Sequence, residues 1–301
     1  MSAIRAPAVA GLFYPSDPRQ LAHDVQSLLA AAQPHNLSPK ALIVPHAGYI
    51  YSGAIAATAY ATLLKPPPSP QPSDVTTSHS TRPPKDGDQV AGYPTRGEGV
   101  AQRIRRVVLL GPTHRVAVRG LALPGVEAFD TPLGRIMVDA AAARSIAHLP
   151  QVTVSAQAHA LEHSLEVQLP FLQSVLPDFT LLPLAVGMAT PEEVAEVLEA
   201  LWGGEETLIV ISSDLSHFLP YAVAQRVDHG TAQDILKLHQ PIEHDHACGG
   251  TPVSGLIVAA RRHRLTPHLL DLRNSGDTAG SHDQVVGYAA LAFTEEENHV
   301  H

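Results

Sequence analysis

The chain has 301 residues, of which 45% are hydrophobic, and it carries a formal net charge of −9 at pH 7. A chain of this length can bury one large core, and its negative charge, without a basic patch, disfavours binding to the phosphates of nucleic acids. No apolar run reaches the roughly 18 residues of a membrane span, and the N-terminus lacks a signal-peptide pattern. We therefore expect a cytoplasmic protein that contacts neither nucleic acid nor membrane.

Short apolar runs that are typical of buried strands recur along the chain, at residues 41–44, 107–110, 179–187, 207–211 and 285–293. Runs that are apolar on both faces indicate strands covered by helices on each side. Helical patterns occur at residues 15–32, 163–176 and 190–202, the last opening with Thr190 as an N-cap and Pro191 in the first turn. This alternation predicts an α/β fold with a mainly buried central sheet flanked by helices.

Residues 65–99 interrupt this alternation. Proline, serine, threonine and glycine dominate the segment, which has almost no aliphatic residues. It cannot bury enough apolar area to offset the entropy of ordering it. Because strand-like sequence resumes at Val107, we interpret residues 65–99 as a mobile Pro/Ser-rich insertion within a single α/β domain that spans residues 1–295.

Titratable side chains follow three of the predicted strands. His46 follows the first strand, His114 follows the second, and Asp214 and His217 follow the run at 207–211. Ligands of open α/β sheets bind at the carboxyl ends of the strands, so these side chains are expected to meet at one edge. A single histidine in such a place is more often a hydrogen-bonded structural group, but the repeated arrangement favours a functional site.

The only cysteine, Cys248, precedes two glycines, a proline and a helical run. The N–H groups at a helix N-terminus stabilise a thiolate, which makes Cys248 a candidate metal ligand. The alternative is a small buried apolar residue, which free cysteine usually is. His244 and His246 form an H-x-H-x-C pattern with Cys248 and are a second candidate ligand set.

Two histidines and a thiolate suit a first-row transition metal, since imidazole binds iron, copper and zinc and a thiolate adds a soft ligand. Three protein ligands also leave positions open for water, dioxygen or a substrate. His217 is a candidate acid or base because its ordinary pKa lies near neutrality. Asp214 is a candidate for orienting His217, three residues away, with a helix N-cap as its structural alternative. Glu162, His163 and Glu166 form another polar stretch, whose ordinary interpretation is a solvated helix face.

Seven sequence blocks resemble, in order, those of the Memo-like family, whose prokaryotic members are called AmmeMemoRadiSam system protein B. The blocks read RAPAVAGLFYPSDPRQL, VPHAGYIYSG, LLGPTHR, EHSLEVQLPFLQ, SSDLSHF, CGGTP and NSGDTAGSHDQVVGYAA. The resemblance covers nearly the whole chain. The insertion at residues 65–99 is the main departure, and it falls between two matching blocks.

The resemblance implies a fold similar to that of the class III extradiol dioxygenases, which are non-haem iron enzymes. In those enzymes two histidines and a carboxylate bind iron, and a further histidine acts as a base. The resemblance places the two histidine ligands at His46 and His114, the carboxylate position at Cys248, and the base at His217. A cysteine in place of the carboxylate changes the electron density at the metal and can itself be oxidised, so catechol cleavage is not implied.

Three functional hypotheses follow. The first is a mononuclear non-haem iron site, with copper or zinc as other candidate ions, in a protein with a redox or oxygen-linked role that acts on a small molecule or dioxygen. The second is a metal-free pocket that binds a peptide or partner protein and presents Tyr49 and Tyr51. The third is an active extradiol-type dioxygenase.

Overall fold

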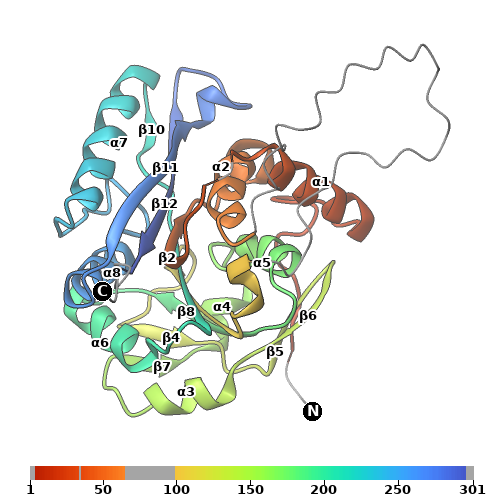
Figure 1. Cartoon of the computed structure of the whole chain (residues 1–301), viewed down its shortest axis with the longest axis vertical. Coiled ribbons are helices and arrows are strands. Elements are labelled where there is room, and N and C mark those ends of the chain that lie inside the picture. The colour runs from red at the N-terminus through yellow and green to blue at the C-terminus, as the bar shows by residue number, and fades with distance from the viewer. Residues whose placement is uncertain (1–3, 34, 65–98, 296–301) are drawn as a thin grey trace, which may run out of the picture.

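A computed structural model describes residues 4–33, 35–64 and 99–295. The predicted insertion, apart from residue 99, lies outside the described residues. A large sheet forms the centre of the molecule (Figure 1). Its strands lie in the order β10-β12-β2-β9-β3-β8-β4-β7, and β11 pairs with β12. The predicted α/β fold with a large central sheet flanked by helices is confirmed.

Four adjacent parallel strands form the middle of the sheet. They are β2 (Pro39–Val44), β9 (Thr207–Ser212), β3 (Arg106–Pro112) and β8 (Thr180–Val186). Leu42 and Val44 pack in the core on one face of β2, while Ala41 and Ile43 pack in the core on the other face. Burial on both faces explains why these strands read as unbroken apolar runs.

Antiparallel strands extend both ends of this parallel core. On one side lie β12 (Val285–Thr294), β11 (Thr266–Asn274) and β10 (His217–Leu219), with β12 antiparallel to β2. On the other side lie β4 (Leu121–Leu123), antiparallel to β8, and β7 (Val152–Val154). A separate small sheet contains β1 (Ile4–Arg5), β5 (Ala128–Thr131) and β6 (Gly134–Met137).

Helices cover both faces of the central sheet. One core includes side chains of α1 (Pro18–Ala31), α2 (Tyr49–Ala61) and α5 (Leu169–Val175), and the other includes side chains of α3 (Ala140–Ile146), α6 (Pro191–Leu201) and α8 (Gly250–Arg262). The helix α7 (Tyr221–Leu236) packs against β11 and β12, and α4 (Ala156–Ala160) is a single short turn. None of the described helices is long and apolar enough to cross a membrane.

Local sequence signals account for the helix ends. Asp17 caps α1 by accepting hydrogen bonds from the backbone N–H groups of Arg19 and Gln20, and Thr190 forms a capping box with Glu193 at α6.

The helix predicted over residues 163–176 is shorter than expected. It is divided into a 3₁₀ turn, η3 (Glu166–Gln168), and α5, because Pro170 has no N–H to donate in a continuous α-helix. Two further 3₁₀ turns are η2 (Gly99–Gln102) and η4 (Ser275–Asp277).

Glu166 is fully buried and holds the N-terminal segment against the body of the protein. Its carboxylate accepts hydrogen bonds from the Arg5 guanidinium at 2.6 Å, the Tyr14 hydroxyl at 2.6 Å and two backbone N–H groups, of Ala8 and Val9. Arg5 also donates to the carbonyl oxygens of His159 and Glu162, both at 2.7 Å. The solvated helix face considered for this stretch is therefore wrong, since Glu166 has an internal partner for each oxygen.

We expect Glu166→Gln to lower the free energy of unfolding by about 3–5 kcal/mol, because it leaves the Arg5 charge buried without its partner. Urea unfolding followed by circular dichroism measures the change. The matched control is Glu205→Gln, which removes an exposed ion pair with Arg103 (3.0 Å) and should cost at most about 1 kcal/mol. Equal effects of the two substitutions would contradict a central role for Glu166.

Candidate metal centre

Three segments that are distant in the sequence bring donor atoms together at one edge of the sheet. His46 follows β2, His114 follows β3 and Cys248 precedes α8, and one donor atom from each lies within 4.8 Å of the other two. His46 Nε2 lies 3.3 Å from Cys248 Sγ. The two histidines meet because β2 and β3 both run parallel to β9, so that their carboxyl ends reach the same edge.

The hydrogen bonds behind His46 determine its tautomer. The Ser212 hydroxyl donates to the carbonyl oxygen of Ser164 at 2.6 Å and accepts from the Gln168 amide at 2.8 Å. Ser212 Oγ has only one proton, so at its 2.9 Å contact with His46 Nδ1 it must accept. His46 therefore carries its proton on Nδ1, and its Nε2 lone pair faces Cys248.

Burial reinforces this neutral state of His46. The residue is 2% exposed, and burial, with the neighbouring His163 and His114, lowers its pKa well below the ordinary value. Neutral imidazole is the form that binds metal ions. The His46 ring is thus prepared as a ligand by contacts on its far side.

Glu162 determines the tautomer of His114, as Ser212 does for His46. Its carboxylate accepts from His114 Nδ1 at 2.9 Å and from the His114 backbone N–H at 2.6 Å. Burial alone would raise the pKa of Glu162, but hydrogen bonds from His114 and Ser164 lower it to about 2, so the group is ionised. The His114 Nε2 is left for the donor cluster, an arrangement common among metal-binding histidines. Glu162 is buried, so the solvated helix face is wrong for this residue also.

Cys248 reaches the cluster from the loop before α8. Its backbone N–H donates to the Asp214 carbonyl oxygen at 3.2 Å. Burial, with the nearby charge of Asp214, raises the pKa of the thiol to about 12. In the protein without a cation, burial thus outweighs the stabilisation of the thiolate expected from the helix N-terminus.

Asp214 holds the turn that carries His46. Its carboxylate accepts the His46 backbone N–H at 2.7 Å, and burial raises its pKa to about 7 although hydrogen bonds from the backbone of His46 and Ala47 oppose the shift. No contact between Asp214 and His217 is found among the described residues. Asp214 is not a helix N-cap either, since β10 follows it and α7 begins only at Tyr221.

His217 lies at the start of β10 and pairs with Val286 of β12. It is not part of the group of three mutually close donors among the described residues. Burial lowers its pKa, and the charge of His114 lowers it further. His217 is therefore a neutral imidazole, and it lies close enough to His114 for the charge of that residue to affect its pKa. Its role as an acid or base stays a prediction.

His163 belongs to the site although no role was assigned to it from the sequence. Its ring stacks on that of His114 with centroids 4.7 Å apart and meets the His46 ring edge-on at 5.4 Å. It forms a second group of close donor atoms with His114 and Glu162. Two features of the sequence could have indicated this role for the segment. They are the polar EHS triplet before an apolar run and Gln168, a polar residue within that run.

The H-x-H-x-C alternative is not assembled in the structure. His244 and His246 are exposed, and neither joins a group of close donor atoms in the described part of the chain. The His244 ring instead lies 3.2 Å from the Thr251 hydroxyl.

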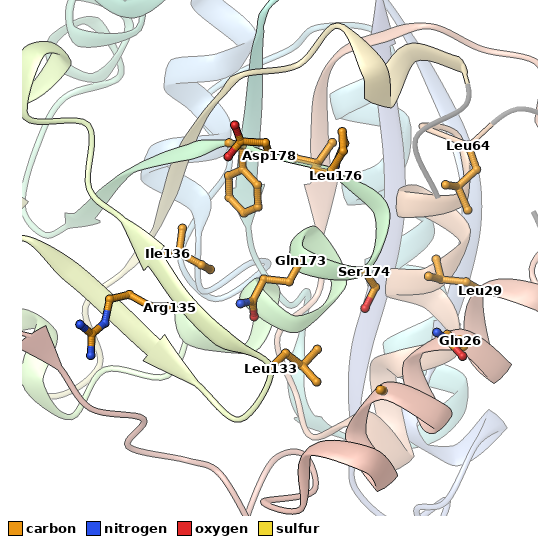
Figure 2. Close-up of a pocket in the computed structure, with 13 residues that line it drawn as sticks. Gln26, Leu29, Leu64, Leu133, Arg135, Ile136, Gln173, Ser174, Leu176 and Asp178 are labelled. Carbon is orange, nitrogen blue, oxygen red and sulfur yellow. The ribbon is translucent and has the colours of Figure 1, made fainter. Parts of the chain in front are cut away.

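A separate cavity of about 580 Å³ contains none of the cluster residues. Figure 2 shows Gln26 and Leu29 of α1 on one side of this cavity, with Leu133 of the β5–β6 turn and Ile136 of β6 on the other. The titratable groups collected at the strand ends do not line it. The candidate chemistry therefore lies at the sheet edge and not in this cavity.

Comparison with known proteins places the chain among its relatives. A family model described as Memo-like protein matches residues 5–75 and 98–292. The chain belongs to the Memo-like family. The two matched stretches are separated by residues 76–97, which fall within the predicted insertion.

Curated relatives match over nearly their full length. A MEMO1 family protein of Aquifex aeolicus is 32% identical, with 96% of this chain and 99% of that protein covered. A MEMO1 family protein of Methanosarcina barkeri is 31% identical with the same coverage. Among solved structures, the chain is similar to an uncharacterized protein of Escherichia coli K12, JW3007. The two share 15% identity with a TM-score of 0.43, and the match covers 63% of this chain and 86% of that protein.

We expect the thiol of Cys248 to react slowly with iodoacetamide in chelator-treated protein, because only the thiolate reacts. With a pKa of about 12, the thiolate fraction is small at pH 8 and rises about tenfold per pH unit until the pH approaches 12. Mass spectrometry of the protein's only cysteine measures the rate between pH 8 and 10. Protein unfolded in urea is the control and should level off near pH 9; levelling off at the same pH in the folded protein would contradict the raised pKa.

Proposed function

We propose that this Memo-like protein binds one transition-metal ion through His46 Nε2, His114 Nε2 and Cys248 Sγ, and that it has a redox or oxygen-linked role. The observation that carries the proposal is the convergence of three donor atoms within 4.8 Å of one another. The far nitrogen of each imidazole has an oxygen partner, Ser212 Oγ for His46 and a Glu162 oxygen for His114. Such outer partners orient metal ligands and raise their basicity.

The donor set fits a first-row ion. Two imidazoles and a thiolate suit iron, copper and zinc, and we propose iron(II) as the native ion, with copper or zinc as the alternatives. Such an ion would supply Lewis acidity and, if iron or copper, a one-electron redox couple. Three protein ligands leave room for a small molecule or dioxygen.

Cys248, Glu162 and His217 determine where protons are held or released at the centre. The Cys248 thiol must lose its proton to serve as a ligand, so metal binding should release a proton and strengthen as the pH rises. The ionised Glu162 holds the His114 proton on Nδ1 and places a negative charge behind the centre. His217, a neutral imidazole, would accept or donate a proton at the bound small molecule.

Two other roles have less support. Tyr49, expected to line a peptide pocket, is buried and donates its hydroxyl proton to the Val167 carbonyl oxygen, so it offers little surface to a partner. Tyr51, the second tyrosine of that hypothesis, is half-buried. Extradiol cleavage of catechols remains a hypothesis for which Cys248, in place of a carboxylate, is unfavourable. Oxygen uptake with a panel of catechols tests it directly.

We expect anaerobically purified, tag-free protein to contain about one transition-metal ion per chain, and His46→Ala and Cys248→Ser to lose most of it. Glu162→Gln should weaken binding about 10–100-fold, because it removes the carboxylate that orients His114. Inductively coupled plasma mass spectrometry gives the stoichiometry, and competition with a chelator gives the affinity.

His244→Ala is the matched control, since His244 is an exposed histidine four residues before Cys248 and should leave metal content unchanged. Equal loss of metal from His244→Ala and His46→Ala would indicate surface binding. Metal-free parent protein would contradict the proposed function and favour a pocket that binds a partner without metal.

We expect His217→Ala to keep near-parent metal content while reducing oxygen-dependent turnover by about 10²–10⁴-fold, the usual contribution of an acid–base group. Metal analysis and oxygen-electrode measurements on the same preparation separate the two effects. Asp214→Asn keeps an oxygen that can accept the His46 N–H, so metal should be retained there as well. Metal lost from His217→Ala but kept in His46→Ala would reverse the assignment of ligand and base.

A further inference from the structure

We propose that His163 is a hydrogen-bond acceptor for a small ligand bound at the His46–His114–Cys248 centre. The ligand class is one that carries an N–H or O–H group beside the atom that meets the centre. This inference rests on the proposed metal site and adds a residue that recognises what binds there.

The position of His163 suits contact with a ligand better than coordination of the same ion. Its ring packs on the His114 ring at 4.7 Å and edge-on to the His46 ring at 5.4 Å, so it borders the centre. Among the described residues, however, the mutually close donors are His46, His114 and Cys248, and His163 joins only the group with His114 and Glu162. The ring thus lies beside the two proposed histidine ligands and outside the group of three donors.

The hydrogen bonding of His163 differs from that of a structural histidine. His159, a buried neighbour in the sequence, places Nε2 2.7 Å from the Ala122 carbonyl oxygen, although its Nδ1 also lacks a partner. The ring of His163 makes no hydrogen bond to any described residue, and its Nδ1 is buried without a partner of normal geometry. Its side chain keeps 17% of its surface accessible, and Nε2, which also has no partner, is not among the buried unpaired atoms, so it is open to solvent.

Glu162 determines which nitrogen of His163 is the acceptor. Glu162 Oε1 lies 3.3 Å from His163 Nδ1. A lone pair on Nδ1 would face the negative oxygen, whereas a proton there is attracted to it, so the neutral ring carries its proton on Nδ1. A neutral imidazole with Nδ1–H has an acceptor at Nε2. The accessible nitrogen of His163 therefore accepts a hydrogen bond from the ligand.

The test uses full-length protein loaded with Co²⁺, whose visible spectrum reports ligand binding, and a pair of probes. Acetohydroxamic acid has an N–H beside its metal-binding oxygens, and its N-methyl analogue has none. We expect the parent to bind acetohydroxamic acid about tenfold more tightly than the analogue, as one hydrogen bond allows. In His163→Phe, which keeps an aromatic ring against His114, the ratio should fall to near one while cobalt stoichiometry is unchanged.

Two further variants make the comparison specific. His163→Gln offers an amide oxygen as acceptor and should keep part of the preference. Phe13→Leu alters the ring that contacts His163 at 4.7 Å without removing the imidazole, and it should keep the full preference.

Three results would overturn the inference: a ratio near one in the parent, an unchanged ratio in His163→Phe, or loss of cobalt from His163→Phe, which would make His163 a metal ligand. Failure of the parent itself to bind cobalt would overturn the proposed metal site, and this inference with it. That failure is distinguishable because it is visible before any substitution.

Discussion

The buried loop from Glu162 to Gln168 is the constraint on which the candidate site depends. Its first residue binds His114, the Ser164 carbonyl oxygen and the Gln168 amide fix Ser212 behind His46, and the Glu166 carboxylate holds the N-terminal segment. A single short segment therefore determines the orientation of both imidazoles. Because the loop itself is almost entirely buried, its polar atoms need internal hydrogen bonds, and His163 Nδ1 is an exception without a partner.

This arrangement couples stability to the site. The loop leaves the sheet edge with polar groups directed at β2, β3 and β9, so its contacts form only when those strands are in register. Ser164 Oγ, for example, donates to the Pro112 carbonyl oxygen at the end of β3, and Gln168 donates to the Pro45 carbonyl oxygen just before His46. A change that loosens the loop would therefore release contacts of both histidines together, while Asp214 would still hold His46 through its backbone N–H.

The sequence indicated the fold and the donor residues because both depend on local patterns. Doubly buried strands have continuous apolar runs, and residues at their carboxyl ends must converge at one edge in a parallel sheet, which brought His46 and His114 together. The roles of Glu162 and Glu166 could not be predicted in this way. Their partners lie far away in the sequence, at Arg5 and His114 for example, so the spacing of the two glutamates resembled that of a solvated helix face.

The state of Cys248 could not be predicted from local sequence for a related reason. The helix N-terminus favours a thiolate, but the balance is decided by burial, which only the packing reveals. The packing itself depends on the two glycines that follow. A Cβ on Gly249 would lie 2.6 Å from Ser213 Cβ, and one on Gly250 would lie 2.4 Å from the Ile242 carbonyl oxygen. Only glycine lets this loop approach the end of β9.

The close approach at Gly249 places the thiol against His46, and the same approach shields it from much of the solvent. Proximity to the imidazole and a high thiol pKa therefore have one cause. In the absence of a cation the Cys248 thiol is protonated, because its surroundings disfavour a negative charge. A metal ion that displaces the proton stabilises the thiolate with its own positive charge. The CGG motif thus does more than position a ligand, because it makes ionisation of Cys248 conditional on what binds beside His46 and His114.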